Sequence, residues 1–204
     1  MDKLLIILIP ESHVIEDKIV NFYFNLISTR KRENNWPKVD VVPVDLYTTF
    51  VGEGYDSVKG MTEGRNIFDC DLIFVPIKSN TDGIDMVYNI VLCVVDMKLE
   101  KITLYDPKGR SSKFLQEHFH PVRIYLNQEY QRIYRQPLRD DTFNFTFTMD
   151  LPISETNRHS RVFTCQYAEC LSRGKRLQMT EEIFFYRLKM ISEIYNKRIE
   201  IPRN

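Results

Sequence analysis

The stretch V87-Y-N-I-V-L-C-V-V-D-M-K-L-E-K-I-T-L-Y-D106 decides the fold. Its first nine residues are almost continuously apolar, which is typical of a strand that is buried on both faces. Residues 96–100 predict a turn, and residues 101–106 predict the strand that pairs with the first one. We therefore expect a β-hairpin here, with the carboxylate of Asp106 at the end of its second strand.

Other segments predict the rest of a sheet. The apolar run L72-I-F-V-P-I77 is strand-like, and so are residues 122–126 and 143–147. Residues 39–50 mix strand and turn signals. Residues 51–64 are glycine-punctuated and predict loops or short helices, without the spacing of a phosphate-binding loop.

Helices are predicted over residues 11–27, 111–120 and 180–198 from apolar periodicity and from capping residues at their starts, including Thr180. The residues expected on the buried faces of the first and last helices are Ile15, Ile19, Phe22 and Leu26, and Phe184, Leu188, Ile191 and Tyr195. The expected fold class is therefore α+β, with a central, mostly antiparallel sheet flanked by helices.

Composition indicates an ordinary globular chain and a single domain over residues 1–204. The 28 basic and 28 acidic residues cancel, so charge does not favour nucleic acid or an anionic membrane as the main partner. The apolar run over residues 4–10 is too short to span a bilayer and lacks the pattern of a signal peptide. We expect a cytoplasmic or nuclear protein.

The four cysteines form no CxxC pair and have no zinc-ligand spacing, so neither a metal nor a cofactor is expected. Cys165 stands out because residues 167–172 predict a helix directly after it. A helix N-terminus lowers the pKa of a thiol, which makes Cys165 a candidate nucleophile. Asp106 could orient a histidine that activates such a thiol.

The order of these motifs resembles that of the ubiquitin-like-protein-specific (SUMO/sentrin-specific, Ulp-type) cysteine proteases. In that family an IFIPI-type strand is followed by His-Trp at the start of a hydrophobic strand. A hairpin ending in Tyr-Val-Asp-Ser comes next, and much later an Asp-Cys-Gly that opens a helix. These motifs are matched here by residues 72–77, 87–95, 104–107 and 164–166. The resemblance covers nearly the whole chain and implies a papain-like fold.

The departures from the family pattern fall on the catalytic positions. The histidine falls on Asn89, which cannot take up a proton near neutral pH. Tryptophans that close a tunnel over the diglycine tail of the modifier fall on Ile90 and Val14. The glycine after the nucleophile is Gln166, and His159 stands near the position of the oxyanion-hole glutamine. Losing a general base costs about 10²–10⁴ in rate, and losing an oxyanion donor costs about 10²–10³ more.

The resemblance therefore implies a remnant triad of Cys165, Asp106 and Asn89 that is inactive. We expect a pseudoprotease that binds a protein, either a ubiquitin-like modifier or another partner. Without an imidazole partner, Asp106 is expected to cap the turn that follows it. The residues implied in binding are Asp17, which matches an aspartate of the family, and Val14, Ile90, Gln166 and His159.

Two alternatives stay open. The chain could be an active deSUMOylating or deubiquitinating cysteine peptidase that uses His13 or His159 as an unusual base. It could also be a structural subunit whose cleft is filled by its own side chains. Trp36, in a polar loop beside a proline, is either an exposed anchor for a partner or a hydrophobic residue that covers the loop.

Overall fold

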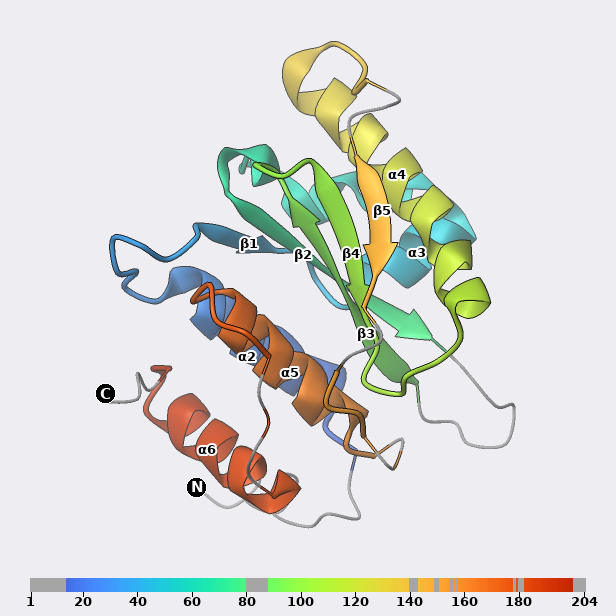
Figure 1. The fold of residues 1–204 in the computed structure, drawn as a ribbon. Coiled ribbons are helices and arrows are strands. Elements are labelled where there is room, and N and C mark those ends of the chain that lie inside the picture. The colour runs from blue at the N-terminus through green and yellow to red at the C-terminus, as the bar shows by residue number, and fades with distance from the viewer. Residues whose placement is uncertain are drawn as a thin grey trace.

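The computed structural model describes residues 14–79, 88–139, 143–148, 151–154, 156, 158–177, 179 and 182–199. A five-stranded sheet with the order β1-β2-β3-β4-β5 forms its centre (Figure 1). Its strands are β1 (Val39–Val41), β2 (Leu72–Ser79), β3 (Asn89–Asp96), β4 (Lys101–Tyr105) and β5 (Asn144–Phe147). The strand pairs β2/β3 and β3/β4 are antiparallel, whereas β1/β2 and β4/β5 are parallel. The predicted α+β class is confirmed, and the sheet is antiparallel at its centre and parallel at both edges.

Helices lie on both sides of this sheet (Figure 1). On one side are α2 (Asp17–Thr29), α5 (Ser160–Leu171) and α6 (Ile183–Tyr195). On the other side are α3 (Leu46–Glu53) and the long α4 (Ser112–Tyr134). Three short 3-10 turns connect α3 to β2: η1 (Tyr55–Ser57), η2 (Lys59–Thr62) and η3 (Ile67–Asp69).

Strand β3 supplies side chains to two separate hydrophobic cores. Ile90, Leu92 and Val94 face the core under α2 and α5, whereas Val91 and Cys93 face the core under α3 and α4. Successive side chains of a strand point to opposite faces, so a strand covered on both sides needs an unbroken apolar run. The prediction that this strand is buried on both faces is confirmed.

The strand predicted over residues 122–126 is wrong, because these residues lie inside α4. The helix begins as expected, with the Ser111 hydroxyl accepting a hydrogen bond from the Phe114 amide at 3.4 Å. It then continues through Pro121 and buries Leu115, Val122 and Leu126, which are spaced as neighbours on one helical face. Packing of that face on the sheet outweighs both the local strand preference and the proline.

The predicted buried faces of α2 and α6 are partly wrong. Phe22, Phe184, Leu188 and Tyr195 are exposed, by up to 70% for Tyr195. Both helices are rotated so that a polar pair lies between them: the Tyr23 hydroxyl donates to the Glu193 carboxylate at 2.6 Å in the interior. The residues that α6 buries are Tyr186, Arg187, Met190, Glu193 and Ile194. Thr180, the predicted cap of this helix, lies outside the described residues.

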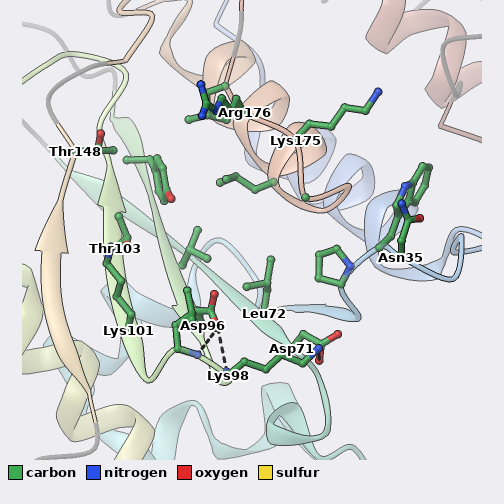
Figure 2. Close-up of a pocket in the computed structure, with 18 of the residues that line it drawn as sticks. Asn35, Asp71, Leu72, Asp96, Lys98, Lys101, Thr103, Thr148, Lys175 and Arg176 are labelled. Carbon is green, nitrogen blue, oxygen red and sulfur yellow. Dashed lines mark hydrogen bonds and ion pairs between the residues drawn. The ribbon is translucent and has the colours of Figure 1, made fainter. Parts of the chain in front are cut away.

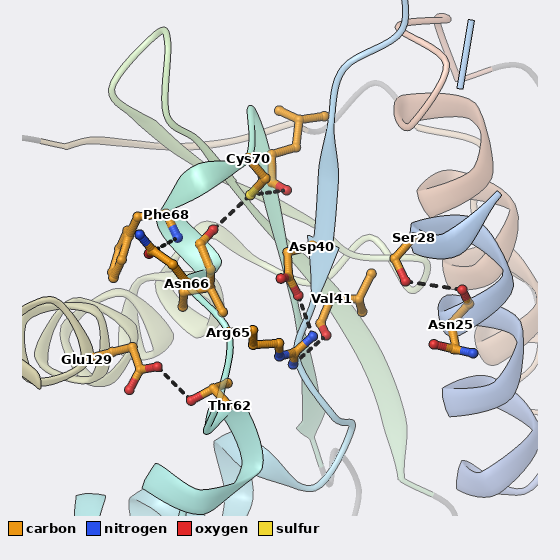
Figure 3. Close-up of polar contacts among 12 residues, drawn as sticks. Asn25, Ser28, Asp40, Val41, Thr62, Arg65, Asn66, Phe68, Cys70 and Glu129 are labelled. Carbon is orange, nitrogen blue, oxygen red and sulfur yellow. Dashed lines mark hydrogen bonds and ion pairs between the residues drawn. The ribbon is translucent and has the colours of Figure 1, made fainter. Parts of the chain in front are cut away.

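Polar side chains fix the 3-10 turns to the rest of the fold (Figure 3). The fully buried carboxylate of Glu129, on α4, accepts hydrogen bonds from Thr62 and Tyr55 at 2.6 and 2.5 Å. Arg65 forms an ion pair of 2.6 Å with Asp40 on β1. A buried carboxylate is stable only when it is paired in this way, so these contacts fix the path of a segment that has few apolar residues.

Candidate active site

Helix α5 begins at Ser160, with His159 as the residue before its first turn. The prediction that Cys165 precedes a helix is therefore wrong, because Cys165 is the sixth residue of α5. The sequence predicts this helix over residues 167–172 and leaves out residues 160–166. Tertiary contacts place them in the helix: the Thr164 hydroxyl donates to the carbonyls of both Ile90 and Ser160, at 2.6 and 3.0 Å.

The side chain of Cys165 lies in the core between α5 and the sheet, where it has no solvent exposure. Burial raises the pKa of its thiol, and the negative charge of Glu193 adds to this, although Arg161 acts in the opposite direction. A thiol in the middle of a helix also gains little from the helix dipole, whose effect is confined to the first and last turns. This environment disfavours a thiolate and does not activate a nucleophile.

Asn89 is the first residue of β3 and is fully buried. It pairs with Ser79, the last residue of β2, in the antiparallel ladder. The Ser79 hydroxyl accepts a hydrogen bond of 2.7 Å from Arg110. Asn89 therefore lies at the end of the sheet where Arg110 is bound.

Asp106 follows β4 at the same end of the sheet and is 1% exposed. Its two carboxylate oxygens accept hydrogen bonds from the Arg110 guanidinium at 2.7 and 2.8 Å. The backbone amides of Lys108 and Arg110 donate to it as well, at 3.1 and 2.8 Å, so Asp106 caps the turn as expected. Burial alone would raise the pKa of this carboxyl, but the hydrogen bonds and charge of Arg110 outweigh that effect, and the pKa of Asp106 is lowered.

Arg161 joins the start of α5 to two other parts of the chain and is 6% exposed. Its guanidinium donates to the carbonyl of Ile15 at 2.5 Å and to the carbonyl of Tyr88 at 3.2 Å. It also forms an ion pair of 2.6 Å with Asp17. The buried guanidinium thus connects the residues before α2, the residue before β3 and the start of α5.

Asp17 is also part of a series of ion pairs that extends from Arg161 to the surface. Its second oxygen lies 2.8 Å from the ammonium of Lys78, which lies 2.7 Å from Asp45. Asp17 is the first residue of α2, where a negative charge is also favoured by the helix dipole.

The other predicted binding residues do not form one surface. Gln166 and Ile90 are buried, and the Gln166 amide points to the Tyr23 hydroxyl at 3.4 Å, away from solvent. Core packing accounts for both side chains in the folded chain, and their role in binding stays a prediction. Val14 and His159 are half-buried, and His13 lies outside the described residues.

Sequence reasoning missed Ser160, Arg161 and Arg110. A signal for Arg110 was present, because Asp106 and Arg110 are four residues apart around a turn that contains Gly109. No local signal marks Arg161, whose partners Asp17 and Ile15 are distant in sequence. In the described part of the chain no three His, Cys, Asp or Glu side chains gather as a metal site, and no helix is long and apolar enough to cross a membrane.

The model of the Ulp1 protease family, C-terminal catalytic domain, matches residues 13–200. The chain belongs to the Ulp1 protease family. Family relatives include human sentrin-specific protease 2 and a sentrin-specific protease of Caenorhabditis elegans, which are 25% and 27% identical to it. Each of these alignments covers 92% of this chain but only 31% and 26% of the relative.

Solved structures of Ulp1 family members have the same fold. The C-terminal Ulp1 protease domain in complex with SMT3, the yeast ortholog of SUMO, aligns over 95% of this chain and 81% of that one. The TM-score is 0.74 at 18% sequence identity. A Chaetomium thermophilum Ulp1-like SUMO protease catalytic domain aligns over 94% of this chain and 76% of that one, with a TM-score of 0.66 and 15% identity. The prediction of a Ulp-type fold is confirmed.

Proposed function

We propose that this chain is a catalytically inactive member of the Ulp1 family that binds a protein partner of the ubiquitin-like class. The observation that carries the proposal is the position of Arg161. Its side chain is buried between Ile15 and Tyr88, next to Val14 and Ile90, the two positions at which the family pattern has its tunnel tryptophans. We infer that an arginine here takes the space that a diglycine tail would need.

The nucleophile position is the second element of the proposal. In the family pattern the nucleophilic cysteine opens a helix, and the residue that opens α5 is Ser160. We therefore assign the nucleophile position to Ser160 and not to Cys165, and the position of the following glycine to Arg161. A serine is a weak nucleophile unless a neighbouring base takes its proton.

No such base is supplied by the two remaining triad positions. Asn89 cannot act as a general base near neutral pH. Asp106 holds the guanidinium of Arg110 with two hydrogen bonds, so it already has a cationic partner where an active enzyme would need an imidazole. Loss of the base, the thiol and the open channel together favours binding without turnover.

The partner class follows from the family. A Ulp1 protease domain is known in complex with SMT3, and this chain shares its fold. With the channel occupied by Arg161, we propose that the chain contacts the folded body of a ubiquitin-like protein and does not enclose its C-terminal tail.

A SUMO protein with a C-terminal aldehyde tests the chemistry, because an aldehyde adds to serine and to cysteine nucleophiles alike. We expect no covalent adduct and no release of a fluorophore from a SUMO–coumarin substrate. Adduct formation that is abolished by Ser160→Ala or by Cys165→Ala would identify an active peptidase and refute the proposal.

Titration with SUMO that lacks its last two glycines tests the mode of binding. We expect this truncated SUMO and the intact protein to bind with the same Kd within about twofold, a difference of less than about 0.5 kcal/mol. A loss of tenfold or more on truncation would show that the tail enters the site. Absence of binding to SUMO and to ubiquitin would favour the structural-subunit alternative.

A further inference from the structure

A groove lies at the Asp96 end of the sheet, opposite the Asn89 end. It is on the same face of the sheet as α2 and α5, beyond the end of α5. Near Asn89, this face carries Ile90 and Leu92, which lie under α5. Helix α5 ends at Leu171, and beyond it the same face carries Val94 and Asp96 on β3 and Tyr105, Thr103 and Lys101 on β4. The uncovered part of the sheet forms a groove of about 1340 Å³. This volume exceeds the roughly 300–1,000 Å³ that is usual for small-molecule pockets and suits an extended chain.

The groove has an apolar floor and firm walls. Its apolar lining includes Leu72, Val94, Leu99, Tyr105, Leu151, Leu171 and Leu177. One wall is the loop of Trp36 and Pro37, and the other is the turn after α5, where Gly174 has a φ of +65°. These walls approach each other closely, because a Cβ at Gly174 would lie 3.9 Å from the ring of Pro37.

Trp36 strengthens the first wall. It is 6% exposed, and the guanidinium of Arg30 lies over its ring at 4.5 Å. The interpretation of Trp36 as a hydrophobic residue that covers its loop therefore holds, and its prediction as an exposed anchor is wrong. A wall held in place before binding reduces the entropy that a bound peptide must offset.

The charges along the groove are unbalanced. Among the described residues that line it, five are basic, namely Arg32, Lys98, Lys101, Lys175 and Arg176, and two are acidic, Asp71 and Asp96. Asp71 is already paired with Lys98 at 2.9 Å and with Arg32 at 3.7 Å.

The other three basic residues stand on both sides of the groove. Figure 2 shows Lys175 and Arg176 on the turn after α5, and Lys101 on β4 across the groove. Within the described part of the chain, none of the three is in an ion pair. Three cations thus remain available along an apolar floor.

We propose that this groove binds an extended acidic peptide segment of a partner protein, with its apolar side chains on the floor and its carboxylates on Lys101, Lys175 and Arg176. Carboxylates that pair with arginine and lysine form charge-assisted hydrogen bonds and supply orientation. Asp71 and Asp96 repel phosphates and peptide carboxylates alike, so it is the apolar floor, and not the charge, that favours a peptide with apolar side chains over a nucleic acid. The site is independent of the proposed function, because β3 separates it from Asn89 by about 24 Å at 3.4 Å per residue.

A fluorescein-labelled peptide, Gly-Glu-Leu-Asp-Ile-Glu-Leu-Asp-Glu-Gly, is the probe, and ¹⁵N NMR titration of the full chain locates its site. We expect amide shift changes at Thr103, Lys175 and Leu177, and a Kd that rises with salt concentration. The double variant Lys175→Glu/Arg176→Glu should weaken binding at least about tenfold, because reversal replaces attraction by repulsion.

The matched control is Lys113→Glu/Arg139→Glu, which makes the same change in net charge at exposed positions outside the groove and should leave the Kd unchanged. The proposal is overturned if no shifts occur at about 1 mM peptide, which corresponds to binding weaker than about −4 kcal/mol. It is also overturned if both double variants weaken binding equally. A peptide with lysine at every acidic position, or a ten-nucleotide single-stranded DNA, that binds as well as the probe would equally refute it.

Discussion

The two ends of β3 use charged residues in opposite ways. At the Asn89 end, which we call the closed end, Asp106 and Arg161 are buried and Arg110 is mostly buried. Arg110 donates hydrogen bonds to Asp106, and Arg161 donates to the carbonyls of Ile15 and Tyr88. At the Asp96 end, the open end, Lys101, Lys175 and Arg176 line a groove and stay in contact with solvent. Charges at the closed end therefore hold the fold together, whereas charges at the open end are available for a partner.

The largest expected effect is the difference in stability loss between substitutions of two aspartates, one at each end of the hairpin. Asp106→Ala leaves the Arg110 side chain, which is only 14% exposed, without its carboxylate, and we expect a loss of about 3–5 kcal/mol in the free energy of unfolding. Asp96→Ala, the matched control, removes bonds to the amides of Lys98 and Leu99 in a solvated turn and should cost about 0.5–1.5 kcal/mol. Urea unfolding measures both, and equal costs would contradict the distinction between the two ends.

Arg161→Ala should have the next largest effect. The substitution removes a buried ion pair with Asp17 and hydrogen bonds to two backbone carbonyls. Asp17 keeps Lys78 as a partner and is partly exposed, so we expect a loss of about 2–4 kcal/mol, less than for a fully buried pair. Arg158→Ala, at an exposed position near the start of α5, is the control.

The closed end should also respond to pH through His118. Burial, assisted by the positive charge of Arg110, lowers the pKa of this imidazole below its ordinary value of about 6.5. The unfolded chain therefore binds this proton more readily than the folded chain does. The contribution of His118 to the free energy of unfolding is fully present above about pH 6.5 and falls as the pH drops below that value. In urea unfolding between pH 7.5 and 5.5, His118→Asn should flatten this decline.

His118→Asn keeps a side-chain partner for the Tyr47 hydroxyl, which lies 2.8 Å from the imidazole. His120→Asn, on the same helix, should leave the pH dependence as it is in the unaltered chain. A decline that persists unchanged in His118→Asn would show that another group is responsible.

The smallest effect is expected at the open end. Arg176 is exposed, so Arg176→Ala should change the free energy of unfolding by no more than about 0.5 kcal/mol. Thermal unfolding of this variant beside Arg161→Ala compares two arginines of one chain directly. A large loss for Arg176→Ala would mean that the groove is part of the folded scaffold.

The sequence was sufficient for the central hairpin and for the family because their signals are local. The unbroken apolar run of β3 and the turn after it predicted the hairpin, and the order of motifs placed Asn89 and Asp106 at one end of the sheet. Residues 122–126 misled because a β-branched and aromatic run after a proline fits a strand until helix packing is considered.

The site itself depends on contacts that the sequence does not reveal. Arg161 meets Asp17 and Ile15, and its carbonyl partners are backbone atoms without a residue signature. The start of α5 was misplaced because Ser160 follows polar residues that give no periodic signal. If the nucleophile position is Ser160, as we propose, that one error displaced it by five residues, from the helix start to the buried helix interior.

The burial of Cys165 gives the chain a built-in reporter. Its sulfur lies in the contact between α5 and β3, and burial keeps the thiol protonated. A maleimide can react with this thiol only when that contact opens. The rate of alkylation, followed by mass spectrometry, therefore measures how often the helix separates from the sheet. Cys165, which the sequence predicts as the remnant of a nucleophile, is thus better suited as a probe of local unfolding.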